Sequence, residues 1–246
     1  MKIYPSKTDL FFENNKMKNI ELGSNETKIK YYVEKEYDYK TIFFNNLENV
    51  ENILKLEIQH FFDKLNIKKG NHIFVVGLGN DNHTADSVGP KTLKHIKVNS
   101  YLKNLEIETD KTIVSALEPG VLGETGIMTN KIIKSVVDEI KPDLVILIDS
   151  FVSGNINYLN KTIEVTDFGL NPGGGLKGIN EKIDNETLGI PVIVIGVTTS
   201  IEVKFTNEEN KNFIPYLLSS KDVDDYVNKI SLIVGESINA SIDDLE

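Results

Sequence analysis

The chain has 246 residues, of which 40% are hydrophobic and 26% charged, as expected for a globular protein with one sizeable α/β domain. It has no cysteine, which excludes disulfides, thiolate catalysis and sulfur-ligated zinc or iron. The net charge of −10 argues against nucleic acid as the main partner, and all 27 basic residues are lysine, so there is no guanidinium clamp for phosphate. No apolar run approaches the about 18 residues of a membrane span and no signal peptide is recognisable, so we expect a cytosolic protein.

The first part of the chain is expected to form a small N-terminal lobe, residues 1–68. Residues 1–27 are polar and read as a loop or flexible tail. The following KIKYYVEKEYDYKTIFF mixes aromatic and β-branched residues with charges, which predicts one or two half-exposed strands. NVENILKLEIQHFFDKLNI then carries apolar residues at helical spacing.

Residues 69–246 are predicted to form an α/β core with a C-terminal helix. Four short apolar runs, HIFVVGLG, TIVSAL, LVILID and IPVIVIGV, are typical of buried strands in a mostly parallel or mixed sheet. Helical stretches lie between several of them, in DSVGPKTLKHIK and GETGIMTNKIIKSVVDEIKP, which predicts helices on both faces. A final helix is expected in SKDVDDYVNKISLIVGESINASI.

The loop VVGLGNDNHTADSVGP begins like a nucleotide-binding motif, with Gly77 and Gly79 after an apolar run. The dinucleotide fingerprint needs a third glycine where this chain has Asn82, so the two glycines are better explained by a tight turn at a strand end. NPGGGLKG does not complete a phosphate loop either. Nucleotide binding is therefore the last of the functions considered.

Two aspartates are the candidate catalytic groups. Asp86 either caps the helix that follows or performs chemistry, and Asp149, after the apolar run LVILI, either bonds loop amides or lies in a ligand crevice at a strand end. If the first and third core strands are neighbours, both acids reach the same rim of the sheet. Two adjacent carboxylates share one proton and thus offer an acid and a base, which suits activation of water without a metal or covalent intermediate.

Several other loops are either flexible surface loops or candidates for substrate binding. SALEPGVLGETGI and TDFGLNPGGGLKG are rich in glycine, and GVTTSIEV brings hydroxyl groups and an acid after a buried strand. The candidate substrate-binding residues are Gly79, Asn80, Glu118, Gly120, Gly173, Gly174, Thr199 and Glu202.

The blocks GLGNDNHTADSVGP, VSALEPGVLGETGI, ILIDS, DFGLNPGGGLKG and ETLGIPVIVIGV occur in the order and spacing of the spore germination protease family. The resemblance runs from about residue 71 to 203 and resumes near LLSSKDVDDYVNKISLIVGESINASI. It implies an atypical aspartic endopeptidase that degrades small acid-soluble spore proteins during germination, with Asp86 and Asp149 as catalytic acids.

The resemblance also implies regulation and assembly. YPSKTDL is similar to the segment where the family's zymogen is trimmed, which implies a propeptide of residues 1–9 and cleavage between Asp9 and Leu10. A cytoplasmic homotetramer in the forespore or spore core is implied, with no cofactor, no direct nucleic acid and no membrane. The core is also similar to hydrogenase-maturation endopeptidases, which bind nickel through two acids and a histidine. No histidine here fills that third place, so no metal is expected.

The chain departs from the family pattern in three places. It lacks most of a segment around KFTNEENKNFIP, it has Thr198 and Glu202 where the family commonly has proline and aspartate, and its N-terminal lobe matches weakly. Two rival functions stay open beside the leading one. They are a nickel-dependent maturation endopeptidase of the same fold, and a non-catalytic sporulation protein that binds its partner without cutting it.

Overall fold

The computed structural model describes residues 2–5, 8–14, 21–23, 27–34, 36–105, 111–171, 182–207 and 210–246. In these residues the chain folds as an α/β protein around one mixed sheet, which confirms the predicted fold class. None of the helices in this part of the chain is both long enough and apolar enough to cross a membrane.

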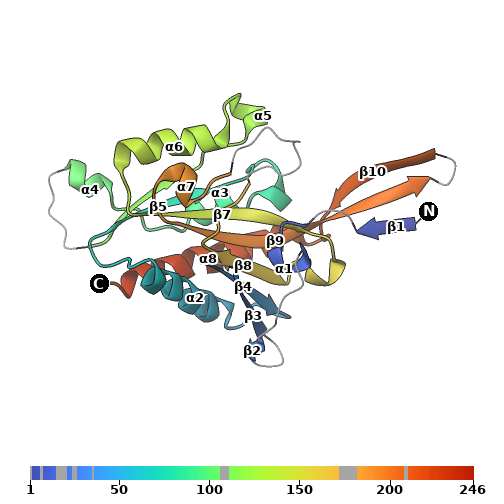
Figure 1. Ribbon diagram of the computed structural model, residues 1–246, viewed down its shortest axis with the longest axis horizontal. Coiled ribbons are helices and arrows are strands. Elements are labelled where there is room, and N and C mark those ends of the chain that lie inside the picture. Colours follow the sequence, from blue (N-terminus) through green and yellow to red (C-terminus); the bar gives the residue numbers. More distant parts are fainter. Residues whose placement is uncertain are drawn as a thin grey trace.

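The sheet of the described residues has ten strands, in the order β2-β3-β4-β8-β9-β7-β5-β6, with β1 and β10 also paired to β9 (Figure 1). The strands are β1 Lys2–Pro5, β2 Glu21–Gly23, β3 Thr27–Glu34, β4 Tyr37–Phe44, β5 His72–Gly77, β6 Ile113–Leu117, β7 Leu144–Ser153, β8 Thr162–Thr166, β9 Val192–Asn207 and β10 Asn210–Leu218.

Four strands at one end of this order, β9, β7, β5 and β6, run parallel to one another. They are the four apolar runs of the sequence, and they are apolar at successive positions because the sheet is covered on both faces. The other strands pair antiparallel: β8 with β9, β4 with β8, β3 with β4 and β2 with β3. The first and third core strands, β5 and β7, are thus direct neighbours.

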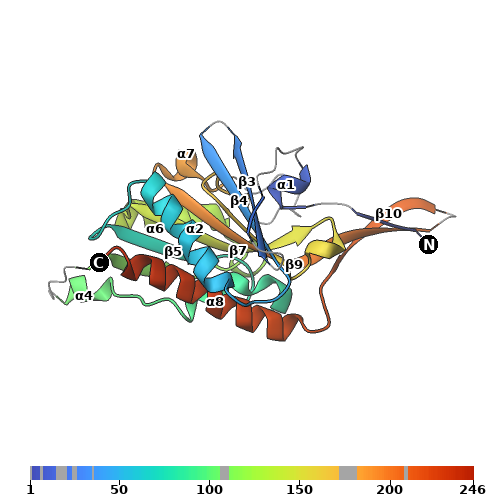
Figure 2. The ribbon, with the colours of Figure 1, turned by 90° about the horizontal axis from the view of Figure 1, so that it is seen from below.

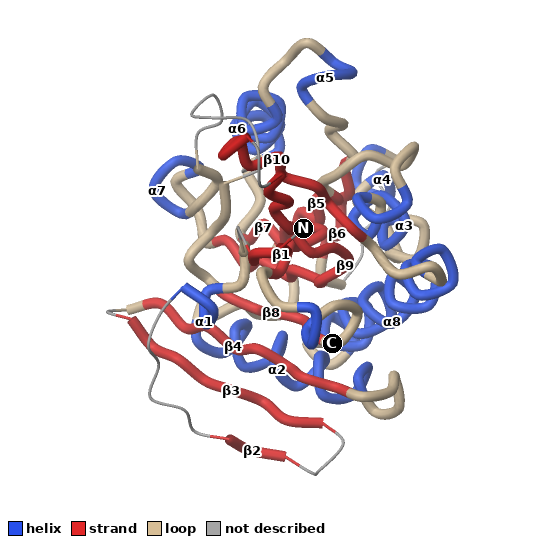
Figure 3. Tube along the Cα trace, turned by 90° about the vertical axis from the view of Figure 1, so that its right-hand side faces the viewer, coloured by secondary structure: helices blue, strands red, loops and turns tan. Residues whose placement is uncertain are grey.

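Helices cover the sheet on both sides, as the sequence predicts (Figures 2 and 3). The helices are α1 Phe11–Asn14, α2 Val50–Lys64, α3 Val88–Leu93, α4 Tyr101–Asn104, α5 Leu122–Thr125, α6 Thr129–Ile140, α7 Asn185–Leu188 and α8 Val223–Asp243, with short 3-10 turns η1 Thr84–Asp86 and η2 Ile156–Tyr158.

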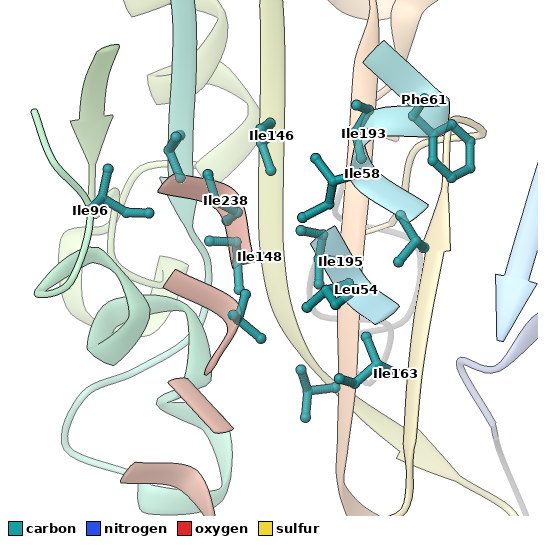
Figure 4. Packing of buried hydrophobic residues seen from close by; sticks show 14 of the residues in the cluster. Leu54, Ile58, Phe61, Ile96, Ile146, Ile148, Ile163, Ile193, Ile195 and Ile238 are labelled. Carbon is teal, nitrogen blue, oxygen red and sulfur yellow. The ribbon is translucent and has the colours of Figure 1, made fainter. Parts of the chain in front are cut away.

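Each face of the sheet has its own hydrophobic cluster. On one face, α2, α3 and α8 pack on alternate side chains of β5, β7 and β9. The cluster includes Leu54 of α2, Ile146 of β7, Ile195 of β9 and Ile238 of α8 (Figure 4). On the other face, α6 and α7 pack on the alternate residues of the same strands. The alternation is the ordinary consequence of the two-residue period of a strand.

The N-terminal residues contribute to the same sheet as the core. The strands β3 and β4 extend the sheet beyond β8, and α2 packs beside α8. Within residues 1–27, read as a loop or tail, the structure has β1, α1 and β2, and Leu10 is completely buried. The division at residue 68 stays a prediction.

A long β-arm projects from the body of the molecule (Figure 1). The far half of β9 pairs with β10 on one side and with β1 on the other. The strands β9 and β10 include the described residues of the stretch KFTNEENKNFIP, where the resemblance implies that the chain lacks a segment; that difference stays a prediction.

Candidate active site

The two candidate acids come together because β5 and β7 are parallel neighbours. Gly77, the last residue of β5, pairs with Ile148, and the next residue, Leu78, donates its backbone N–H to the Ile148 carbonyl at 2.8 Å. The chain then turns away from the sheet and returns at η1, which ends at Asp86. Asp149 is the residue after Ile148, so both acids lie where β5 ends.

The turn that carries Asp86 requires a glycine at position 79. Gly79 has a φ of +110°, and a Cβ atom there would lie 2.0 Å from the Asp86 carbonyl oxygen. Asn80 donates its backbone N–H to that same oxygen at 3.0 Å. Gly79 therefore allows the tight turn that the sequence predicts for VVGLGNDNHTADSVGP, and this turn closes on Asp86. Such a loop differs from the phosphate-binding loop of a dinucleotide fold.

Asp86 does not cap the following helix. The N-cap of α3 is Ser87, which makes no side-chain cap bond, and the first helical N–H, that of Val88, donates to Ser150 Oγ at 3.3 Å. The Asp86 carboxyl is half-buried, and burial raises its pKa to about 6, against opposing effects of the Asn80 N–H and of His83. His83, in the same loop, is exposed but contributes to this electrostatic environment.

Asp149 has the more strongly shifted carboxyl group. Burial raises its pKa well above the ordinary value, and the carboxylates of Asp86 and Asp9 raise it further, in that order. A hydrogen bond from the Ser150 N–H to Asp149 Oδ1, at 2.9 Å, acts in the opposite direction. The two candidate acids thus interact electrostatically, and the pKa of each is raised.

The placement of Asp149 at the end of its strand was wrong in one respect. The strand β7 continues to Ser153, so Asp149 lies within it, opposite Gly196 of β9. Its other neighbour, β5, stops one residue earlier, so Asp149 is at the edge of the sheet on that side only. The strand β7 continues past the end of β5 because β9 pairs with it as far as Ser153.

The predicted cleavage segment lies beside this site. Asp9 donates its N–H to the Val152 carbonyl at 2.7 Å and accepts the Val152 N–H on Oδ2 at 2.8 Å. Leu10 is completely buried in the hydrophobic cluster of that face, and Phe11 stacks on Tyr39 with 3.6 Å between ring centroids. The segment Thr8–Asn14 therefore covers the sheet next to Asp149, and its own carboxylate contributes to the pKa there.

A third acid with a raised pKa, Glu164 of β8, was missed in the sequence. It is 2% exposed and accepts hydrogen bonds from the Phe11 N–H, at 3.1 and 3.3 Å, and from Thr41 Oγ1, at 3.2 Å. Burial raises its pKa to about 8. The alternation Thr162, Glu164, Thr166 was the available signal, but such a pattern indicates a solvated strand face, and here Phe11 covers that face.

The remaining predicted residues are divided among three places. Thr199 is 1% exposed and donates its hydroxyl to the Ala85 carbonyl at 2.5 Å, so it contacts the turn of Asp86. Glu118 and Gly120 follow β6, one strand further from β7 than β5 is. Glu202 pairs with Leu217 at the base of the β-arm. Gly173 and Gly174 lie outside the described residues.

Over the described ranges, no three side chains of histidine, aspartate or glutamate are grouped so as to hold a metal ion. One side-chain hydrogen bond links the loop after β5 to α5: Asn82 Nδ2 donates to Glu124 Oε1 at 3.1 Å.

Comparison with known proteins identifies the relatives of the chain. The family model described as "Germination protease" (Peptidase_A25) matches residues 29–219. The germination protease of Geobacillus sp. (strain WCH70) is 39% identical over 170 residues, which are 68% of this chain and 46% of that protein. The germination protease of Oceanobacillus iheyensis is 40% identical over 165 residues, 66% of this chain and 45% of that protein.

A third relative, the germination protease of Bacillus licheniformis, is 42% identical over 158 residues, 63% of this chain and 43% of that protein. The matched part is thus somewhat less than half the length of each of these relatives. The family match covers Asp86, Asp149 and the strands that carry them. The chain therefore belongs to the germination protease family.

Proposed function

We propose that this protein is an endopeptidase that degrades small acid-soluble spore proteins during germination, with Asp86 and Asp149 activating a water molecule. The observation that carries the proposal is the pairing of β5 with β7, which brings the two acids to one place where both pKa values are raised. Membership of the germination protease family supports the reaction class, and the substrate is the one that the sequence resemblance implies.

The different environments of the two acids support different roles. Asp86, with a pKa of about 6, is ionised at neutral pH and accepts a proton from the attacking water. Asp149 keeps its proton and donates a hydrogen bond to the scissile carbonyl oxygen, which gains negative charge as the water oxygen bonds to the carbon. The C–N bond then breaks as the leaving nitrogen takes up a proton from the pair, and the remaining proton restores the starting state.

The decisive experiment is cleavage of a purified small acid-soluble spore protein, followed by mass analysis of the fragments. Asp86→Asn and Asp149→Asn should each lower kcat by about three orders of magnitude, or roughly 4 kcal/mol in barrier, with the fold intact by circular dichroism. Asp81→Asn is the matched control, because Asp81 lies in the same loop and only forms an exposed ion pair with Lys94. Full activity in either of the first two variants would refute the acid pair.

We also propose that the protein is made as a zymogen and cuts itself between Asp9 and Leu10. The hydrogen bonds of Asp9 to Val152 and the effect of Asp9 on the pKa of Asp149 support this, because they place the segment beside the acids. Mass analysis of wild-type protein after incubation should show loss of residues 1–9, whereas Asp149→Asn protein should keep them.

A homotetramer in the spore core is the remaining part of the proposal. The exposed side chains of Tyr216, Leu217 and Leu218 on the β-arm support self-association, because consecutive exposed apolar residues on an edge strand favour a partner. Analytical ultracentrifugation gives the oligomeric state, and a monomer at micromolar concentration would contradict this part.

A further inference from the structure

The pairing of β7 with β9 is irregular next to the two acids. Phe151 of β7 pairs with Thr198, but the next residue, Val152, pairs with Ser200. Thr199 is therefore an additional residue in β9 without a partner on β7, which is the arrangement of a β-bulge. Bulges bend the strand and redirect a side chain, and they are frequent next to active sites.

The redirected side chain reaches the turn that ends at Asp86. Thr199 Oγ1 donates to the carbonyl oxygen of Ala85, the residue before Asp86, at 2.5 Å, and Thr199 is 1% exposed. This hydrogen bond joins residues 114 positions apart in the chain. Without the bulge, the side chains of β9 would alternate regularly between the two faces, and the hydroxyl at position 199 would have a different direction.

The turn has hydrogen bonds within itself, among them Asp86 N–H to the His83 carbonyl at 2.7 Å and Ser87 Oγ to the Thr84 carbonyl at 2.8 Å, but these bonds do not tie it to the sheet. Neither η1 nor α3 has a side-chain cap bond. The Asn80 N–H closes the loop on the Asp86 carbonyl, and two further bonds reach the sheet: the Val88 N–H donates to Ser150 Oγ of β7, and Thr199 Oγ1 of β9 donates to the Ala85 carbonyl. Of these, the Thr199 bond joins the turn to β9, which is the strand beside Asp149 on the side away from β5.

We propose that Thr199 is a positioning residue, whose hydroxyl, aimed by the bulge in β9, fixes the Asp86 turn against Asp149. The consequence for catalysis rests on the proposed function, whereas the consequence for the geometry of Asp86 does not. Loss of the hydroxyl leaves the part-buried Ala85 carbonyl without this donor, so the turn shifts toward solvent to be hydrated. A displacement of about 1 Å in a reacting group is enough to lower a rate by roughly 100-fold.

The test compares variants that differ in the hydroxyl alone. Thr199→Val replaces the hydroxyl with a methyl group of similar size, Thr199→Ala removes it without adding bulk, and Thr199→Ser retains it. Thr198→Val is the matched control: Thr198 is also buried in β9, but its hydroxyl contacts Thr162 Oγ1 at 2.6 Å and not the Asp86 turn.

Two readouts are expected to move together. In Thr199→Val and Thr199→Ala, kcat on a small acid-soluble spore protein should fall by roughly 10- to 100-fold with little change in KM. The midpoint of the Asp86 carboxyl titration, followed by carbon-13 NMR and assigned with Asp86→Asn, should fall from about 6 toward the ordinary value as the turn becomes exposed. Thr199→Ser and Thr198→Val should resemble the wild type in both.

Each other outcome overturns the proposal. Wild-type kcat and Asp86 titration in the valine and alanine variants would remove any role for the hydroxyl. Equal losses in Thr199→Ser or in Thr198→Val would reduce the effect to general packing of β9. If Thr199→Val does not fold, the alanine and serine variants give the same comparison. If the wild type cuts no spore protein, the proposed function fails, and the Asp86 titration alone decides the role of Thr199.

Discussion

Asp149 and Glu164 lie level with each other across the sheet, each directly opposite Gly196 of β9. Since neighbouring strands are about 4.8 Å apart, the backbones of the two acids are roughly 10 Å apart. The ring of Phe151 occupies the space over Gly196, where a Cβ atom would lie 2.2 Å from the ring. Asp149 and Glu164 therefore flank Gly196 at the same height along the strands, and the Phe151 ring packs on that glycine.

Gly196→Ala should destabilise the protein, because the new methyl group and the Phe151 ring cannot occupy the same space. We expect a loss of about 1–3 kcal/mol in the free energy of unfolding, typical of an overpacked core. Urea denaturation measures it. Gly123→Ala is the matched control, since a Cβ at that position in α5 meets no atom within 4 Å. Equal stability of the two variants would mean that the ring moves aside freely.

Glu164→Gln should remove a pH dependence of stability. The pKa of Glu164 is raised from 4.5 to about 8, so between these values the folded state holds a proton that the unfolded state has lost. The contribution of Glu164 to the free energy of unfolding is fully present below about pH 4.5. It declines as the pH rises to about 8, with a slope of up to about 1.4 kcal/mol per pH unit.

Urea denaturation of wild type and Glu164→Gln at several pH values isolates that contribution, because Asp86 and Asp149 are present in both proteins. The difference in the free energy of unfolding between variant and wild type should increase with pH. A difference independent of pH across this window would show that Glu164 is ionised in the folded protein.

The activity of the wild type should have a bell-shaped pH dependence. Protonation of Asp86 removes the base, so kcat/KM should fall below about pH 6, and ionisation of Asp149 removes the acid, so it should fall again at high pH. Rates on a spore-protein substrate at constant ionic strength give the profile. An activity that rises continuously as the pH falls from about 6 to about 4 would reverse the proposed roles.

Asp9→Asn should lower the pKa of Asp149. The Asp9 carboxylate raises the pKa of both Asp149 and Glu164, so loss of its charge favours ionisation of both. An asparagine can still accept the Val152 N–H, so the segment stays in place. Carbon-13 NMR of the carboxyl groups follows the titrations.

Glu13→Gln is the matched control for this charge effect. The Glu13 carboxylate contributes to the raised pKa of Glu164 but is not among the causes of the shift at Asp149. The two variants should thus both lower the titration of Glu164, while only Asp9→Asn lowers that of Asp149. The same shift of Asp149 in both would point to a general loosening of the N-terminal segment.

The central strands and the acid pair follow from the sequence because they depend on short-range patterns. Apolar residues on both strand faces predict a covered parallel sheet, and one further condition, that β5 lies beside β7, brings Asp86 near Asp149. The glycine at position 79 was recognisable as a turn residue for the same reason. Each of these features is a property of a single segment or of one neighbouring pair.

The parts that could not be predicted are relations among distant segments. Glu164 is a polar residue on an alternating strand, and only the docking of Phe11 makes its face buried. The bulge at Thr199 exists only in the register between β9 and β7, which neither strand reveals alone. Strands β3 and β4 were expected, but their place beside β8 in the same sheet depends on long-range pairing.

The two hydrogen bonds between Asp9 and Val152 use both the donor and the acceptor of that backbone position. An extended peptide that pairs with β7 at Val152 would need the same N–H and the same carbonyl. Occupancy by residue 9 and occupancy by any such peptide are therefore mutually exclusive, so the N-terminal segment is a competitor for this stretch of β7. Because the segment is part of the same chain, its effective concentration does not depend on the protein concentration. A peptide can therefore pair at Val152 only after the segment has left, or when the peptide is in large excess.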